Sequence, residues 1–174
     1  MLLSNNAVMK SLKSNLHYII ICFAILFISC TKENNQINST IEVNLDKVKM
    51  LSLINAVRST GCKCGTTNMP KVNPLAWNDT LAVAALNHST DMNVKGYFSH
   101  TNKENLDPGD RLRNLKFPWR TYGENIALGQ INEEDVMQAW LNSPGHCQNI
   151  MEASFKLVGV ARVNNYWTQV FASK

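Results

Sequence analysis

The sequence predicts an α+β fold, a three-layer α-β-α sandwich in which helices cover both faces of a central antiparallel sheet. Helical periodicity recurs in several segments between residues 41 and 151, whereas residues 157–163 and 166–172 have the composition of strands. Asn164-Asn165 between the two strands favours a two-residue hairpin turn, because asparagine tolerates positive φ. Apolar residues occupy both faces of both strands, which indicates a sheet covered on both sides.

The first predicted helix spans residues 41–58, and Gly61 ends it. Residues 62–76 contain a glycine and two prolines and are predicted to form a loop. The amphipathic pattern of the helix rests on apolar residues at helical spacing, which are Val43, Val48, Leu51, Ile54 and Val57.

The second predicted helix spans residues 79–95, begins at a cap provided by Asn78 or Asp79 and ends near Gly96. One stripe of this helix is predicted to face the core, and it contains Leu81, Ala84, Ala85, His88 and Met92. His88 is therefore expected to be a core histidine.

Three shorter helices are predicted before the strands. Asp107-Pro108 opens the first, over residues 107–116, where Arg111 is expected to lie on the surface. Asn132 caps the second, over residues 133–142, whose acidic first turn suits the helix dipole. Ser143-Pro144 ends that helix and begins the third, which continues to about Met151.

The N-terminal residues predict an export signal. Lys10 and Lys13 precede the apolar run of residues 16–28, which is too short to span a bilayer, since a span needs about 20 residues. The run ends in Leu26-Phe27-Ile28-Ser29-Cys30, which resembles a bacterial lipobox. That resemblance implies that Cys30 becomes the N-terminus and carries the lipid; an ordinary signal peptide with an incidental Cys30 is the alternative.

These features divide the chain into three parts. Residues 1–29 are expected to be a lipoprotein-type signal peptide, residues 30–44 a polar tether and residues 45–174 the folded domain. The protein is therefore expected to be extracytoplasmic and anchored to a membrane, in the periplasm or on the cell surface. Its net charge of +4 is spread along the chain without a basic stripe, so no nucleic-acid partner is expected.

Three cysteines, Cys62, Cys64 and Cys147, lie outside the signal and the lipid site. In an oxidising compartment we expect Cys147 to form a disulfide with Cys62 or Cys64, which leaves one thiol. Closing a loop of about 80 residues would stabilise the domain by about 4 kcal/mol. A metal site made of Cys62, Cys64 and a histidine is the alternative, although the second cysteine pair typical of zinc sites is missing.

Four groups of residues stand out in order along the chain. They are Trp77-Asn78-Asp79-Thr80-Leu81, Asp91-Met92 with Tyr97-Phe98-Ser99-His100-Thr101, Gly123-Glu124-Asn125-Ile126-Ala127, and Trp140-Leu141-Asn142-Ser143-Pro144-Gly145-His146 with Tyr166-Trp167-Thr168-Gln169-Val170-Phe171. Together they resemble the CAP superfamily, the cysteine-rich secretory proteins, antigen five and pathogenesis-related proteins, also called SCP domains. The resemblance covers residues 45–174 and is to the short prokaryotic form.

The resemblance implies an α-β-α sandwich with a surface cavity lined by two histidines and two acids. His100 matches the first histidine, Glu124 the first acid and His146 the second histidine. The second acid is expected three residues after Trp140, where this chain has Ser143. The binding cavity is therefore expected to contain His100, Glu124, His146 and Ser143, with one acid lost.

Two imidazoles and a carboxylate allow several kinds of chemistry. His100, His146 and Glu124 could hold one divalent metal ion, zinc or similar. Without a metal, Glu124 could orient a histidine that acts as an acid or base near neutral pH, or all three could simply tie loops together. No catalytic residue is assigned.

The expected function is binding through this cavity, with a small apolar ligand, a glycan or an envelope protein as the partner. The alternative is a hydrolase, dependent on a metal or on the histidines and Glu124, that acts on peptide or cell-wall substrates.

Overall fold

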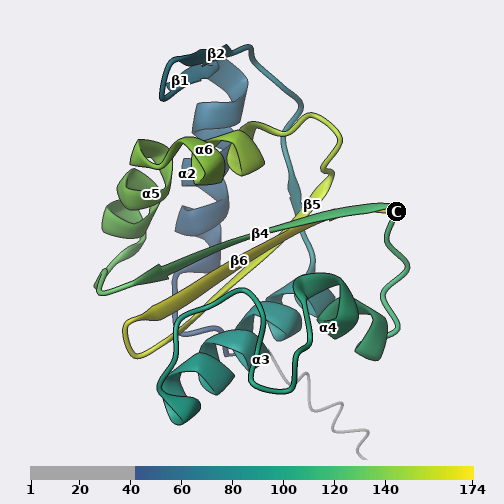
Figure 1. The fold of residues 1–174 in the computed structure, drawn as a ribbon. Helices are drawn as coiled ribbons and strands as arrows, with labels where there is room; N and C mark the ends of the chain where they lie inside the picture. Colours follow the sequence, from purple (N-terminus) through teal and green to yellow (C-terminus); the bar gives the residue numbers. More distant parts are fainter. Residues whose placement is uncertain (1–41) are drawn as a thin grey trace, which may run out of the picture. The chain divides into compact units, whose positions relative to one another are not determined.

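The computed structural model describes residues 42–174 (Figure 1). The predicted signal peptide, the predicted lipid site at Cys30 and most of the predicted tether lie outside the described residues. Among the helices of residues 42–174, none is both long enough and apolar enough to cross a membrane.

The described chain contains helices and strands in the order α2 (Lys47–Thr60), β1 (Cys62–Cys64), β2 (Thr67–Met69), β3 (Ala76–Trp77), α3 (Asp79–Lys95), α4 (Pro108–Asn114), β4 (Thr121–Leu128), α5 (Glu133–Asn142), α6 (Pro144–Met151), β5 (Leu157–Val163) and β6 (Tyr166–Ser173). The predicted helices over 79–95, 133–142 and 144–151 are confirmed, and so are the two C-terminal strands with their turn. The predicted helix over 107–116 is shorter at both ends.

The main sheet has the strand order β3-β5-β6-β4. β6 pairs antiparallel with β5, as predicted, and also with β4, but the short β3 pairs in parallel with β5. The sheet is therefore mixed rather than purely antiparallel. A parallel pair needs a long crossover connection, and the chain between β3 and β5 supplies one with four helices and β4.

The three-layer arrangement is confirmed. Figure 1 shows α2, α5 and α6 on one face of the sheet and α3 and α4 on the other. Two separate clusters of buried side chains fill the spaces between the layers. Trp140 and Trp167 belong to the first cluster, and Leu81 and Leu112 belong to the second. Burial on both faces explains why both C-terminal strands are apolar on both sides.

The start of the domain differs from the prediction. Val43 is buried, and its carbonyl accepts a hydrogen bond from the backbone N–H of Arg162 at 2.9 Å, so the folded part begins before residue 45. Asp46 caps α2 by accepting a hydrogen bond from the backbone N–H of Lys49. The buried face of α2 contains Arg58, whereas Val48, which was predicted to face the core, is exposed.

Strand β4 was not predicted, although its Gly123-Glu124-Asn125 sequence was recognised as a motif. Glycine, glutamate and asparagine are weak strand formers, so the local sequence does not indicate a strand. Pairing along the full length of β6 overrides this preference, with Glu124 opposite Val170. The strand thereby carries the motif's acid into the buried part of the sheet.

Helix α3 lies close against β5 at Gly159. A Cβ atom at this position would lie 2.1 Å from the backbone nitrogen of Ala82, so only glycine allows this approach. The contact fixes the height of α3 over the sheet and with it the position of His88, which lies further along the same helix.

Candidate functional site

The candidate site centres on the carboxylate of Glu124, which β4 holds inside the domain. His100 lies in the loop between α3 and α4, Arg111 lies on α4, and His88 lies on α3. Nδ1 of His100 is 2.8 Å from Oε1 of Glu124, and Nη2 of Arg111 is 2.5 Å from Oε2. Nε2 of His88 is 3.8 Å from Oε1. Side chains from α3, from α4 and from the loop between them therefore meet at one acid of β4.

Arg111 compensates the buried charge of Glu124 and also holds the loop of His100. The side chain of Glu124 is only 2% exposed and that of Arg111 9%. Nη1 of Arg111 donates hydrogen bonds to the carbonyl of His100 at 2.9 Å and to the carbonyl of Leu106 at 3.0 Å. The surface position expected for Arg111 was therefore wrong, because a buried carboxylate requires a charged or hydrogen-bonding partner.

Helix α4, which carries Arg111, is fixed at its N-terminus by a capping box. Asp107 accepts a hydrogen bond from the backbone N–H of Asp110, and the Asp110 carboxylate accepts one from the backbone N–H of Asp107. Pro108 occupies the first turn of the helix, where a missing N–H costs nothing. The Asp107-Pro108 sequence thus begins a short helix from which Arg111 reaches Glu124.

The ring of His100 combines a fixed orientation with access to solvent. Its side chain is 49% exposed, although Nδ1 is bonded to the buried Glu124. A carboxylate bonded to one ring nitrogen sets the orientation of the imidazole and leaves the other nitrogen for a ligand.

His88 is fully buried, as predicted, and lies behind the carboxylate. Its Nε2 is 2.9 Å from the carbonyl oxygen of Ser99, which can only accept, so Nε2 carries the hydrogen and donates it. Nδ1 is left as an acceptor with no partner among the described residues. Burial lowers the pKa of His88, with the positive charge of Arg111 also acting in this direction, and the ring stays neutral near pH 7.

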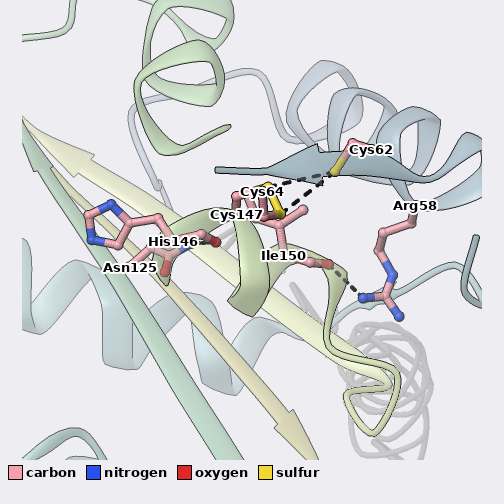
Figure 2. The surroundings of a disulfide bond; sticks show 7 residues. All are labelled: Arg58, Cys62, Cys64, Asn125, His146, Cys147 and Ile150. Atoms are coloured by element: carbon pink, nitrogen blue, oxygen red, sulfur yellow. Dashed lines mark hydrogen bonds between the residues drawn. A yellow bond between two sulfur atoms is a disulfide. The ribbon is translucent and has the colours of Figure 1, made fainter. Parts of the chain in front are cut away.

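His146 approaches from the other layer of helices, on α6. It is half-buried, and both its burial and the nearby His100 lower its pKa. The backbone carbonyl of His146 accepts a hydrogen bond from Nδ2 of Asn125 at 3.1 Å (Figure 2). Nδ2 of Asn149 donates to the carbonyl of Glu124 at 3.2 Å, so side-chain amides join α6 to β4 at the site.

Ser143, the position of the missing acid, begins α6 without a side-chain capping bond and is half-buried. Ser99, which neighbours His100, accepts a hydrogen bond from the backbone N–H of Thr101. Within residues 42–174, no serine or threonine hydroxyl is hydrogen-bonded to the ring of His100 or His146. The described residues therefore contain no serine activated by these histidines.

The predicted metal ligands do not fit a three-ligand site. Among the described residues, the only group of three or more histidine, cysteine or acidic side chains with all ligand atoms within 4.8 Å of one another is Cys62, Cys64 and Cys147. His100, His146 and Glu124 do not form such a group. His100 and Glu124 are in hydrogen-bond contact, and both oxygens of Glu124 already have protein partners in Arg111 and His100.

A pocket of about 230 Å³ opens beside the site, between α3 and α4. Its polar lining includes Asn87, His88, Asp91, Asn102, Arg111 and Asn114. None of the four residues predicted to form the binding cavity lines this pocket. His88 and Arg111 therefore connect the buried carboxylate to a hollow that the sequence did not predict.

The three cysteines of the domain lie between β1 and α6. Figure 2 shows the disulfide between Cys64 and Cys147, which chooses between the two pairings that the sequence left open. Cys62 is a free, half-buried thiol. Its sulfur is 3.8 Å from that of Cys64 and 3.6 Å from that of Cys147.

The comparisons with known proteins agree with this fold. The family model described as "CAP: Cysteine-rich secretory protein family" matches residues 51–171. The protein YkwD of Bacillus subtilis (strain 168) is 35% identical over 145 residues, which cover 82% of this chain and 53% of YkwD. The membrane protein YlbC of the same organism is 33% identical over 100 residues, which cover 58% of this chain and 29% of YlbC. The chain thus spans about half or less of the length of these relatives.

Solved structures show the same similarity. An extracellular protein containing an SCP domain from Bacillus anthracis str. Ames has a TM-score of 0.66 and 33% identity, covering 73% of this chain and 40% of that one. An outer surface protein from Borrelia burgdorferi has a TM-score of 0.59 and 19% identity, covering 75% of this chain and 96% of that one, and this likeness concerns the fold alone. By its family match, its similarity to YkwD and its three-layer fold, this chain belongs to the CAP family of cysteine-rich secretory proteins.

Proposed function

We propose that the protein is an exported, lipid-anchored CAP-domain protein that binds a small ligand or an envelope partner at the surface containing His100 and His146. The observation that carries the proposal is the half-exposed ring of His100, which a buried carboxylate and a buried guanidinium hold in one orientation. Burying an ion pair costs free energy. Binding sites typically contain side chains that such supporting contacts hold in one orientation.

The surroundings of His100 favour a ligand with both an apolar and a polar part. Phe98, two residues before His100 in the same loop, is exposed and adds apolar surface to this loop. The lowered pKa of His146 keeps its ring neutral at pH 7, where it can donate or accept one hydrogen bond. A sugar ring, or an apolar chain with a polar head, matches this combination.

The location of the protein follows from its N-terminal sequence. The lipobox-like segment before Cys30 supports a lipid anchor, and the similarity to an extracellular protein and to a membrane protein is consistent with an envelope location. Mass spectrometry of the N-terminal peptide from the native protein tests this part: a diacylglyceryl adduct on Cys30 is expected, and an unmodified Cys30 contradicts the anchor.

A hydrolase is the second candidate function, and the pair formed by Glu124 and His100 favours it. A carboxylate that holds an imidazole in one orientation positions it to act as a general base toward water, and His146 could then act as a second acid or base. Such an enzyme would attack peptide or cell-wall substrates with activated water, because the described residues provide no activated serine.

Comparison of the wild-type protein with one double variant distinguishes these functions. Full-length protein and the H100A/H146A variant are compared for co-purified ligands by native mass spectrometry, for co-sedimentation with isolated peptidoglycan, and for release of soluble fragments from it. The binding proposal expects a ligand or co-sedimentation that the double variant loses while its Tm stays nearly the same. Fragment release that the variant loses supports the hydrolase.

The exposed Thr101→Ala variant, next to His100, is the matched control and should behave as wild type. If the double variant instead keeps all binding and loses only stability, the histidines hold the loops together and the binding proposal is wrong.

A further inference from the structure

Three sulfur atoms meet between strand β1 and helix α6. Cys62 and Cys64 are alternate residues of β1, so their side chains point to the same face of the strand. That face lies against α6, which carries Cys147 (Figure 2). The sulfur of Cys62 is within 3.8 Å of both sulfurs of the disulfide, so both cysteines of β1 lie close to Cys147.

The three sulfurs differ in their access to solvent. Cys64 is 1% exposed and Cys147 is fully buried, so a dissolved thiol has no direct route to the disulfide. Cys62 is half-buried and is the one member of the cluster that touches the surface. Any exchange between the buried disulfide and the surroundings is therefore easiest through Cys62.

We propose that Cys62, Cys64 and Cys147 form a thiol–disulfide exchange centre in which Cys62 connects the buried disulfide to thiols outside the protein. In the first step the thiolate of Cys62 attacks the sulfur of Cys147. A Cys62–Cys147 bond forms, the Cys64–Cys147 bond breaks, and Cys64 leaves as a thiolate that takes up a proton. The number of disulfides and thiols is unchanged, so this step needs no oxidant or reductant.

The second step involves a small-molecule or protein thiol. Its thiolate attacks the accessible sulfur of Cys62 in the new disulfide, forms a mixed disulfide there and releases Cys147 as a thiolate. A second external thiolate attacks the external sulfur of the mixed disulfide, which frees Cys62 and yields an external disulfide. Each step exchanges one sulfur–sulfur bond for another, and the external thiols supply both electrons.

The first step requires a small movement. The sulfur of Cys62 is nearly equally distant from the two other sulfurs, so it lies beside the disulfide. Attack by a thiolate requires the three sulfurs to lie in line, along the direction of the bond that breaks. Rotation of the Cys62 side chain supplies the change, and β1 is a three-residue strand whose sheet contains only β2 in addition. Burial also raises the pKa of the Cys62 thiol, so exchange should be faster in alkaline solution.

The position of Lys63 makes the exchange measurable, because trypsin cleaves after it and separates Cys62 from Cys64. The folded protein is incubated at a pH above the ordinary thiol pKa of about 8.5. Exchange is then stopped with acid and N-ethylmaleimide, and the protein is digested without reduction. We expect the label on both the Cys62 and the Cys64 peptide, and disulfides from Cys147 to each. Label on the Cys62 peptide alone overturns the proposal.

Two variants test the role of Cys62 as the connection. In Cys62→Ser the Cys64–Cys147 disulfide persists, and its reduction by glutathione is expected to be at least about tenfold slower than in wild type. In Cys64→Ala a Cys62–Cys147 disulfide is expected to form in its place. Equal reduction rates in wild type and Cys62→Ser, or no disulfide in folded Cys64→Ala, overturn the proposal.

Discussion

Nη2 of Arg111 lies 2.5 Å from Oε2 of Glu124, and both side chains are buried between α3, α4 and the sheet. The same guanidinium donates to the carbonyl of His100, whose ring bonds to the other oxygen of Glu124. The carboxylate, the guanidinium and the imidazole are therefore mutually dependent, and removing one leaves the others incompletely paired.

Arg111→Met leaves the Glu124 carboxylate buried without its cation. We expect the free energy of unfolding to fall by about 3–5 kcal/mol, because breaking a buried ion pair costs far more than the pair itself contributes. Urea unfolding measures the change. Arg113→Met on the same helix is the matched control, since its ion pair with Asp110 is exposed to solvent and should contribute little to stability. Equal losses in the two variants would refute a buried pair at Arg111.

The pH dependence of stability should report His88. Burial lowers its pKa below the ordinary value of 6.5. The unfolded chain then takes up a proton at higher pH than the folded protein, so stability is unaffected above about pH 6.5 and decreases as the pH falls below it. The pKa of Asp110 is lowered by Arg113, and the pKa of Glu152 is lowered by a hydrogen bond from the Ser154 backbone. Protonation of these two acids therefore reduces stability only below about pH 4.5.

Urea unfolding at several values between about pH 7.5 and pH 5 measures this decrease. His88→Gln keeps a donor for the Ser99 carbonyl but cannot be protonated, so its stability should change less over the same range. His146→Gln is the companion variant, because the pKa of His146 is also lowered by burial. A decrease of the same size in His88→Gln as in wild type would show that His88 is not the titrating group.

Gly159→Ala should separate α3 from the sheet. The added Cβ would lie 2.1 Å from the backbone of Ala82, and neither element can move without disturbing the core, so we expect a loss of about 3 kcal/mol or more. Gly145→Ala on α6 is the control: it has open space around it, and alanine favours helix by up to about 1 kcal/mol. Thermal unfolding of both variants measures the difference, and a neutral Gly159→Ala would contradict the close packing.

Arg58 is fully buried and donates to backbone carbonyls of three residues that follow it in the chain. These are Asn73 at 2.8 Å, Ile150 at 2.6 Å (Figure 2) and Glu152 at 3.0 Å. Arg58→Met keeps much of the side-chain volume but leaves these carbonyls unpaired, so the free energy of unfolding should fall by about 3 kcal/mol. Arg120→Met, at an exposed position, should change it little. Similar unfolding midpoints for both variants would contradict this role of Arg58.

Most helices and several of their ends were readable because their signals are local, whereas the first helix, predicted over 41–58, spans Lys47–Thr60. Asn78, Asn132 and Asp107 each cap a helix through a side-chain oxygen within three residues, and the stripe of α3 needs only a repeat along one segment. The three-layer arrangement followed from the apolar character of both strand faces. In each case the information lies within one short segment of the chain.

The centre of the candidate site could be read only in part, because it depends on contacts between distant segments. Glu124 and His100 were found as motif residues, and their hydrogen bond joins residues 24 positions apart. Arg111 was placed on the surface because nothing in the short helix shows that a buried acid lies beside it. Likewise β4 is a strand only because β6 pairs with it, which no local preference indicates.

The central position of β6 has a consequence for the order in which the protein takes shape. β4 and β5 lie on either side of β6 and each pairs with it, so within the described chain these two strands become part of one sheet only through residues 166–173. A growing polypeptide that lacks these residues cannot complete either core. Completion of both cores therefore depends on this one strand.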